Sequence, residues 1–273
     1  QTQTASDSAN ITFSSNIDST YDAYVFKFYD IHPETDDAKL MVNFRDGSTA
    51  YDAVKTTTFF NAQHRENGTN GSLGYRSDDD LAQSTAVQPL GMDIGNGNDE
   101  CGVGELKLFN PSSTTFVKHF IATMQVYYSS DYSMNSHIAG YCNTTSAIDG
   151  VQFTAETGNF NGTIKLYGIS AAGFPAGAMT LIKSQTASSS STISFVDGTS
   201  DVVLDSTYPI YLFKFINIHP ASASHLSVGF RDGGTDYDAT KTTTYFRSYH
   251  RESGAESGLG YNSNDDVAQS TAF

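Results

Sequence analysis

The sequence predicts an all-β protein made of tandem jelly-roll-like antiparallel β-sandwich domains, with the second copy truncated. Three observations lead to this prediction. Apolar and polar residues alternate with a period of two in many short runs, as in half-buried strands. A domain-sized stretch of the chain occurs twice. Hydrophobic residues make up 38% of the chain, with 18 Phe and 16 Tyr, and such a supply can fill the space between two stacked sheets.

The repeat is the strongest of the three observations. Asp18–Tyr21 returns as Asp205–Tyr208 at an offset of 187 residues, and Phe44–Gly47 returns as Phe230–Gly233 at an offset of 186. A near-constant offset of this size is far longer than the period of solenoid repeats. The two copies are therefore expected to be domains rather than small repeats.

The repeat divides the chain into three parts. Residues 1–170 form a complete β-sandwich unit, residues 171–178 form a linker rich in Ala and Gly, and residues 179–273 form the N-terminal half of a second copy. The stretch 88–170 has no counterpart in the second copy. Because half a sandwich leaves its apolar face bare, we expect the missing half of the parent protein, or another chain, to cover that face.

Alternation locates the strands of the first copy. Tyr24, Phe26 and Phe28 are expected to face one side of a strand, and Lys27 the other. Further strands are expected at residues 40–44 and 54–60, near residues 105–109, 115–124, 137–142 and 150–154, and at 162–169, where Ile164 and Leu166 face inward. The same pattern predicts strands at residues 211–215 and 226–230 of the second copy.

Composition and charge exclude several classes of function. The net charge is −15, with 15 basic and 30 acidic residues. Such a balance argues against nucleic-acid binding, which needs Lys and Arg against phosphate, and against docking on an anionic membrane. No run of 18 apolar residues predicts a membrane span. The low charged fraction of 16% is common in β-rich extracellular and virion proteins, so we expect a virion-surface or extracellular location.

Cysteine is scarce, with Cys101 and Cys142 as the only two. Their spacing matches no metal-ligand pattern. Two alternatives stay open at this stage. The pair either consists of two buried free thiols or forms a disulfide, which would suit an oxidising compartment.

The most suggestive chemical cluster is His64–Glu66, which returns as His250–Glu252. A histidine beside a glutamate can serve acid–base chemistry. In a strand, however, His64 and Glu66 share one face and Arg65 lies on the other, and no nucleophile accompanies them. We therefore expect a polar strand end with an ion pair.

Acidic clusters recur at Asp78–Asp80 and Asp265–Asp266. Calcium needs six to eight oxygen ligands, so a solvated loop is the favoured interpretation and a calcium site is the alternative. No cofactor is predicted. Exposed tyrosines are candidates for stacking on sugar rings, although packing with a wet hydroxyl is the commoner role of such side chains. The candidates are Tyr21, Tyr51, Tyr75, Tyr127, Tyr128 and Tyr132.

Five stretches together resemble a known family. They are Ile17–Tyr24, Lys27–Pro33, Phe109–Ser113, Gly162–Ile169 and Thr180–Ser190. In their order they are similar to tail-fibre-like virion structural proteins of tailed bacteriophages, of the type found in phages of marine and cyanobacterial hosts. The resemblance implies a β-sandwich unit on the virion exterior, often trimeric and sometimes host-binding. It supplies no catalytic residues, and the tandem copy favours a shaft or decoration role over a fibre tip.

These observations predict a non-enzymatic structural protein of a phage tail fibre or virion appendage. Its expected partners are other copies of itself, in a homo-oligomer such as a trimer, and other virion proteins. The alternative is a lectin-like adhesin module that binds host glycan. A polysaccharide depolymerase is disfavoured, because no pair of carboxylates and no nucleophile motif stands out.

Overall fold

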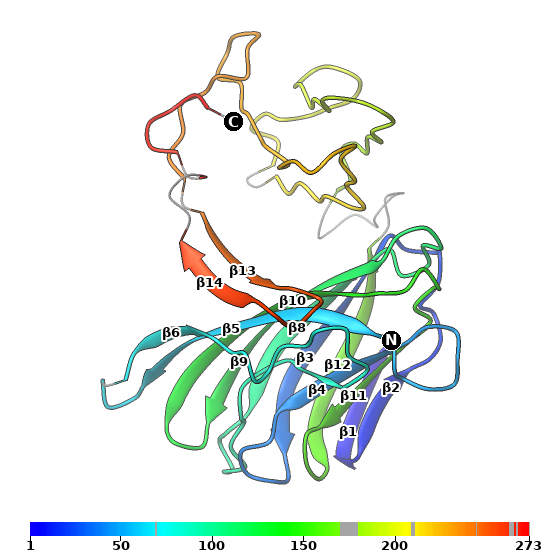
Figure 1. Ribbon diagram of the computed structural model, residues 1–273, viewed down its shortest axis with the longest axis vertical. Coiled ribbons are helices and arrows are strands. Elements are labelled where there is room, and N and C mark those ends of the chain that lie inside the picture. The colour runs from blue at the N-terminus through cyan, green and yellow to red at the C-terminus, as the bar shows by residue number, and fades with distance from the viewer. Residues whose placement is uncertain are drawn as a thin grey trace.

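The computed structural model describes residues 1–68, 70–169, 180–208, 211–243, 245–261, 265 and 267–272. Within these residues the protein is all-β, with fourteen strands and no helix (Figure 1). None of the described residues therefore belongs to a helix that could cross a membrane. The strands are β1 (Thr2–Ser8), β2 (Asn10–Phe13), β3 (Ala23–Pro33), β4 (Leu40–Arg45), β5 (Lys55–Arg65), β6 (Ser72–Tyr75), β7 (Gln88–Pro89), β8 (Gly102–Phe109), β9 (Lys118–Tyr128), β10 (Tyr132–Cys142), β11 (Gly150–Ala155), β12 (Phe160–Ile169), β13 (Phe246–His250) and β14 (Ser257–Tyr261).

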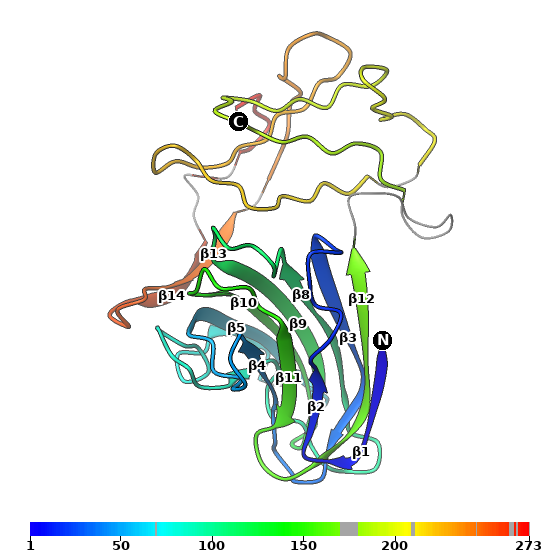
Figure 2. The same cartoon turned by 90° about the vertical axis from the view of Figure 1, so that its right-hand side faces the viewer.

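Twelve of these strands form two antiparallel sheets in the first copy. The larger sheet has the order β1-β12-β3-β8-β9-β10-β5-β6, and the smaller has the order β2-β11-β4-β7. The two sheets form two layers that face each other (Figures 1 and 2). This arrangement gives a β-sandwich-like body whose core lies between the layers.

Aromatic side chains hold the two layers together. Phe153 of β11 contacts Phe13 of the smaller sheet and Phe26 and Phe28 of the larger one, with ring centroids 6.3, 5.3 and 5.3 Å away. All four rings are almost fully buried. Edge-on and tilted aromatic packing adds to the free energy gained from burial, so Phe153 is a central contact of the core.

The predicted strands of the first copy are confirmed. Tyr24, Phe26 and Phe28 face the core, and Lys27 between them is exposed. Ile164 and Leu166 of β12 are likewise buried, whereas Tyr167 is exposed. The period-two pattern therefore identified both the strands and their buried faces.

One charged side chain lies in the core. Lys55 is fully buried at the start of β5, where its Nζ donates hydrogen bonds to Asn43 Oδ1 at 2.6 Å and to the Ala53 carbonyl oxygen at 3.1 Å. Burial lowers the pKa of Lys55 to about 8. Because a buried ammonium is costly even when hydrogen bonded, this lysine makes stability sensitive to pH.

The disulfide considered for Cys101 and Cys142 is wrong for this chain, because both thiols are free. The backbone carbonyl oxygen of Cys101 accepts a hydrogen bond from the Tyr127 amide, at one end of β9. Cys142 pairs with Lys118 at the other end of β9. These two residues of β9 are nine positions apart, or about 30 Å along a strand. A disulfide needs Cα atoms within about 7 Å. Burial also raises the pKa of the Cys142 thiol to about 12.

The second copy differs sharply from the first. The strands predicted at residues 211–215 and 226–230 are absent, and the described part of residues 180–272 contains only the hairpin β13–β14. Those two strands are the counterparts of the end of β5 and of β6. The predicted linker, residues 171–178, lies outside the described residues.

Strand pairing explains which part of the second copy forms a sheet. In the first copy β3 pairs with β12 and β8, and β4 pairs with β11 and β7. Residues 180–272 contain no counterparts of these partner strands. β5 and β6, in contrast, pair with each other, and both have counterparts. A strand without a partner leaves its backbone groups unpaired, so only the hairpin forms.

Candidate functional site

Two places on the first copy gather side chains with a potential function. The first, the hairpin contact, is where β13 and the turn after it rest on the outer face of the larger sheet (Figure 1). The second, the arginine cleft, lies at the end of the larger sheet where β5 and β9 end and β10 begins. The two sites use different residues and are described in turn.

An aromatic stack forms the apolar part of the hairpin contact. Phe59 of β5 points into the core, so its neighbour Phe60 points outward. Phe60 stacks on His137, its cross-strand partner on β10, with centroids 5.0 Å apart. Phe246 of β13 meets Phe60 edge-on at 5.9 Å. Phe246 is the counterpart of Phe60 in the second copy, so the two copies meet through equivalent residues.

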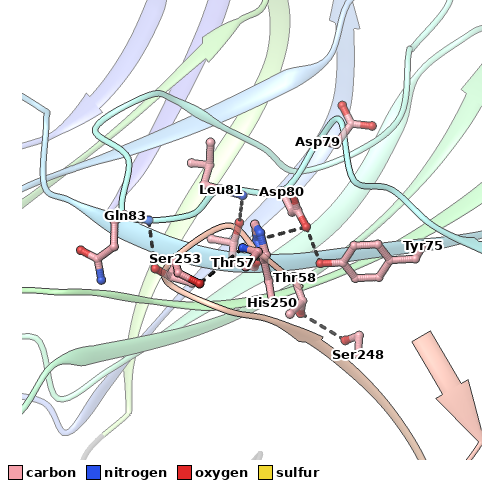
Figure 3. Close-up of polar contacts among 12 residues, drawn as sticks. Thr57, Thr58, Tyr75, Asp79, Asp80, Leu81, Gln83, Ser248, His250 and Ser253 are labelled. Carbon is pink, nitrogen blue, oxygen red and sulfur yellow. Dashed lines mark hydrogen bonds and ion pairs between the residues drawn. The ribbon is translucent and has the colours of Figure 1, made fainter. Parts of the chain in front are cut away.

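A histidine forms the polar centre of the hairpin contact. The Nδ1 atom of His250 lies 3.2 Å from Asp80 Oδ2 and 3.3 Å from the Thr57 carbonyl oxygen (Figure 3). Both neighbours are acceptors, so Nδ1 carries a hydrogen. The His250 and Asp80 side chains are only 8% and 4% exposed. The contact is therefore shielded from solvent.

Three hydrogen-bonded pairs that involve side-chain hydroxyl groups extend the hairpin contact. The Tyr75 hydroxyl donates to Asp80 Oδ2, and the Tyr141 hydroxyl donates to Glu252 Oε1. Ser248 Oγ lies 3.1 Å from Thr58 Oγ1 (Figure 3). Every one of these pairs except Tyr75–Asp80 joins the second copy to the first.

Burial sets the protonation states in the hairpin contact. Burial is the main cause that raises the pKa of Asp80, although the Tyr75 hydrogen bond and the His250 charge oppose it. Burial and the Glu252 hydrogen bond raise the pKa of Tyr141 to about 12. Burial alone lowers the pKa of His137. At neutral pH the Tyr141 hydroxyl is therefore a donor, and His137 is a neutral ring suited to stacking.

The His250–Asp80–Tyr75 group resembles part of a catalytic relay, but it lacks a nucleophile. A relay would place a serine, threonine or cysteine side chain on the imidazole. Within the described residues, the hydrogen bonds of His250 lead to Asp80 and to a backbone carbonyl instead. His250 thus has a hydrogen-bonded carboxylate partner from the other copy, and the ion pair expected for this cluster joins Arg251 to Glu256.

The two predicted histidine clusters have different surroundings. His64 is exposed and Arg65 is half-buried on the opposite side of β5, as the alternation predicted. His250 is buried in the hairpin contact, and Arg251 beside it pairs with Glu256 at 3.0 Å in an exposed position. In the acidic cluster Asp78–Asp80, Asp79 pairs with Lys39 and Arg76, and Asp80 contacts His250. The part of the chain that the structure describes contains no group of three or more His, Cys, Asp or Glu suited to a metal ion.

The arginine cleft has a volume of about 360 Å³. The Arg65 guanidinium lies over the Tyr132 ring, 5.4 Å from its centroid, and Arg65 Nε donates to the Ser130 carbonyl oxygen at 3.1 Å. Tyr128 packs against Tyr132 with centroids 5.8 Å apart. The full lining is Gln63, Arg65, Arg76, Met92, Asp93, Tyr128, Ser130, Tyr132 and Met134.

The tyrosine candidates separate into different roles. Tyr128 and Tyr132 meet in the arginine cleft, and Tyr75 serves the hairpin contact. The others lie apart: Tyr21 packs edge-on against Tyr24, Tyr51 lies beneath Arg45, and Tyr127 faces Asp131.

Sequence reasoning missed Tyr141 and Arg76 as site residues, and it considered Asp80 only as part of an acidic cluster, not as a partner of His250. Asp80 and His250 are far apart in the sequence and belong to different copies, so no local spacing connects them. The outward-pointing Phe60 was the one available signal, because an aromatic residue on a solvent-facing strand position indicates a contact surface. Comparison of the chain with protein-family models, with curated proteins and with solved structures found no match.

Proposed function

We propose that the chain is a non-enzymatic structural protein of a phage tail fibre or similar virion surface appendage, built from tandem jelly-roll-like sandwich units. The observation that carries the proposal is the hairpin contact, in which an element of one copy rests on the outer face of the other. Contact between two copies of one sequence is the elementary step of a repeating assembly. The resemblance to tail-fibre-like proteins and the low fraction of charged residues, 16%, support this function.

The second copy supplies a further reason for assembly. Leu212, Phe215 and Leu226 are more than half exposed, although their counterparts in the first copy are strand residues. Exposed apolar side chains in such number favour association, because burying each large one contributes about 1.5–3 kcal/mol. The proposed partners are therefore other copies of this chain, as in a trimer, together with other virion proteins.

The test is the mass of the native assembly, measured by light scattering on the purified chain. The proposal expects a trimer or a larger polymer. Leu226→Ser should lower the average mass, because it removes an exposed apolar side chain that association with another chain would bury. The control is Ser227→Ala at the neighbouring exposed position, which should leave the mass unchanged. A monodisperse monomer at all concentrations would contradict the proposal.

A second candidate function is a lectin-like, glycan-binding adhesin module. The specific observation in its favour is the arginine cleft, where two tyrosine rings and two guanidinium groups line one hollow. Ligand sites are typically lined by aromatic rings together with a few polar groups in fixed positions. A monomer that is retained on host polysaccharide would favour this function over the structural one.

A further inference from the structure

The arginine cleft lies among strand ends and loops at one end of the larger sheet. Its walls come from the ends of β5 and β9, the start of β10, and the segment after β7 that carries Met92 and Asp93. Met134 and Met92 are buried and form its floor, whereas Arg65, Tyr128 and Tyr132 are half-buried. The cleft is thus an apolar floor with polar and aromatic walls, and it uses none of the residues of the hairpin contact.

The charge of the cleft is opposite to that of the whole chain. Two guanidinium groups, Arg65 and Arg76, line it against the single carboxylate of Asp93. Asp93 is itself paired with Lys39, at 3.6 Å. In a chain with a net charge of −15, a hollow lined by two arginines is a local site for an anion.

Both arginines are held in place by the protein. The Arg65 Nε–Ser130 hydrogen bond and the stacking on Tyr132 fix the first guanidinium. Arg76 Nε lies 3.3 Å from Oδ2 of Asp79, and the other oxygen of this buried carboxylate accepts from Lys39 at 2.7 Å. Groups that are ordered before the ligand arrives lose less conformational entropy on binding.

The aromatic walls point to a ligand with a flat apolar face. Tyr132 is oriented by a 3.0 Å hydrogen bond that its hydroxyl accepts from the Asn70 amide. Tyr128 lies beside it at an interplanar angle of 54°. Rings held in this way can pack against the C–H face of a pyranose, while their hydroxyl groups remain available to solvent or ligand.

We propose that the arginine cleft binds an acidic sugar residue of the uronate type, with its carboxylate against Arg76 and Arg65 and its ring against Tyr128. Planar guanidinium forks match a carboxylate bidentately, which explains why arginine rather than lysine lines the cleft. A volume of about 360 Å³ accommodates one sugar residue with its carboxylate rather than a long chain. The inference is independent of the structural function, because it concerns the first copy alone.

The test is calorimetric titration of the purified chain with a galacturonate oligomer. Two comparison probes each carry one part of the ligand. A neutral galactose oligomer has the sugar ring without the carboxylate, and acetate has the carboxylate without the ring. The proposal expects binding of the galacturonate oligomer, at least tenfold weaker binding of the neutral one, and no saturable binding of acetate. Equal affinity for the neutral oligomer, or no binding of the acidic one, would overturn it.

Variants locate the site. Arg76→Gln should weaken binding of the acidic oligomer at least tenfold, and Arg76→Lys should weaken it less, because lysine keeps the charge but loses the fork. The matched control is Arg251→Gln, the same change at the counterpart of Arg65, which lies outside the cleft. Equal loss in the control would overturn the proposal. If Arg76→Gln unfolds the chain, Tyr128→Ala provides the second variant. Unchanged binding of the acidic oligomer by Tyr128→Ala would also contradict the proposal.

Discussion

The two copies share their sequence pattern but not their structure. Phe26 and Phe28 of the first copy are 0% and 1% exposed, whereas their counterparts Phe213 and Phe215 are 45% and 60% exposed. The residues themselves are unchanged. What differs is that β8 and β12 lie on either side of β3, whereas no strand of the described residues pairs with residues 211–215.

Contacts between neighbouring parts of the sequence do recur in the second copy. The Tyr24 hydroxyl donates to the Asp18 carbonyl oxygen at 3.1 Å, and the Tyr211 hydroxyl donates to the Asp205 carbonyl oxygen at 2.9 Å. The isolated bridge between Lys55 and Ser84 likewise returns between Lys241 and Ser270. Both kinds of contact need only residues that the two copies share.

The comparison separates local from non-local stabilisation. Turns and short loops form from their own sequence, so they appear in both copies. A sheet and its core need strands that are distant in the sequence, and these give most of the burial free energy. The second copy therefore has the local contacts of a sandwich without its core.

The largest predicted effect comes from making the first copy resemble the second. Phe153→Ala removes the ring that contacts Phe13, Phe26 and Phe28, and the second copy has no counterpart of it. We expect a loss of about 3–5 kcal/mol in the free energy of unfolding, measured by urea titration. The control is Phe215→Ala, which should change the same transition by less than about 0.5 kcal/mol because that ring is exposed.

The next effect concerns pH. The unfolded chain holds the Lys55 proton up to the ordinary pKa of 10.5, whereas the folded chain releases it near pH 8. Between these values the unfolded state binds more protons, so the free energy of unfolding rises with pH. The rise amounts to about 3 kcal/mol at most.

Lys55→Met should abolish this rise, as measured by urea titrations at pH 7.5 and 10, values chosen at about the two ends of the window. The control is Lys27→Met, the same change at a lysine of β3 whose side chain is exposed. Identical pH profiles for wild type and Lys55→Met would show that the lysine is not buried as a neutral amine.

The smallest effect concerns the hairpin contact, where β13 and the turn after it meet the first copy. Tyr141→Phe removes the hydroxyl that donates to Glu252. We expect the docking of β13–β14 to weaken by about 0.5–1.5 kcal/mol, measured as faster amide hydrogen exchange in β13. Tyr167→Phe, at an exposed position on β12, is the control. Faster exchange in both variants would indicate a general loosening instead.

The sequence predicted the first copy better than the second, for a physical reason. Alternation shows which face of a strand can be buried, and it correctly located β3, β4, β5 and β12. It does not show whether a partner strand exists, so it predicted strands at residues 211–215 and 226–230 that the structure lacks. The short strands β2, β6 and β7 have too few residues to display a period.

The sites were less predictable than the fold. Arg65 and Tyr132 could be placed on one face of their strands, yet the cleft between them also needs Arg76 and Asp93 from loops. The hairpin contact depends on Asp80 meeting His250 from another copy. Both arrangements arise from tertiary packing, which spacing in a single sequence does not encode.

The central claim is that residues 211–215 and 226–230 form no strands because residues 180–272 contain no counterparts of the strands that pair with β3 and β4. The most direct test appends residues 88–169 after residue 273, which restores the order of segments found in the first copy. Hydrogen exchange across residues 211–230 is then compared with that of the original chain. The account predicts strong new protection there, of the same order as in β3 and β4. Unchanged rapid exchange in residues 211–230 would contradict it.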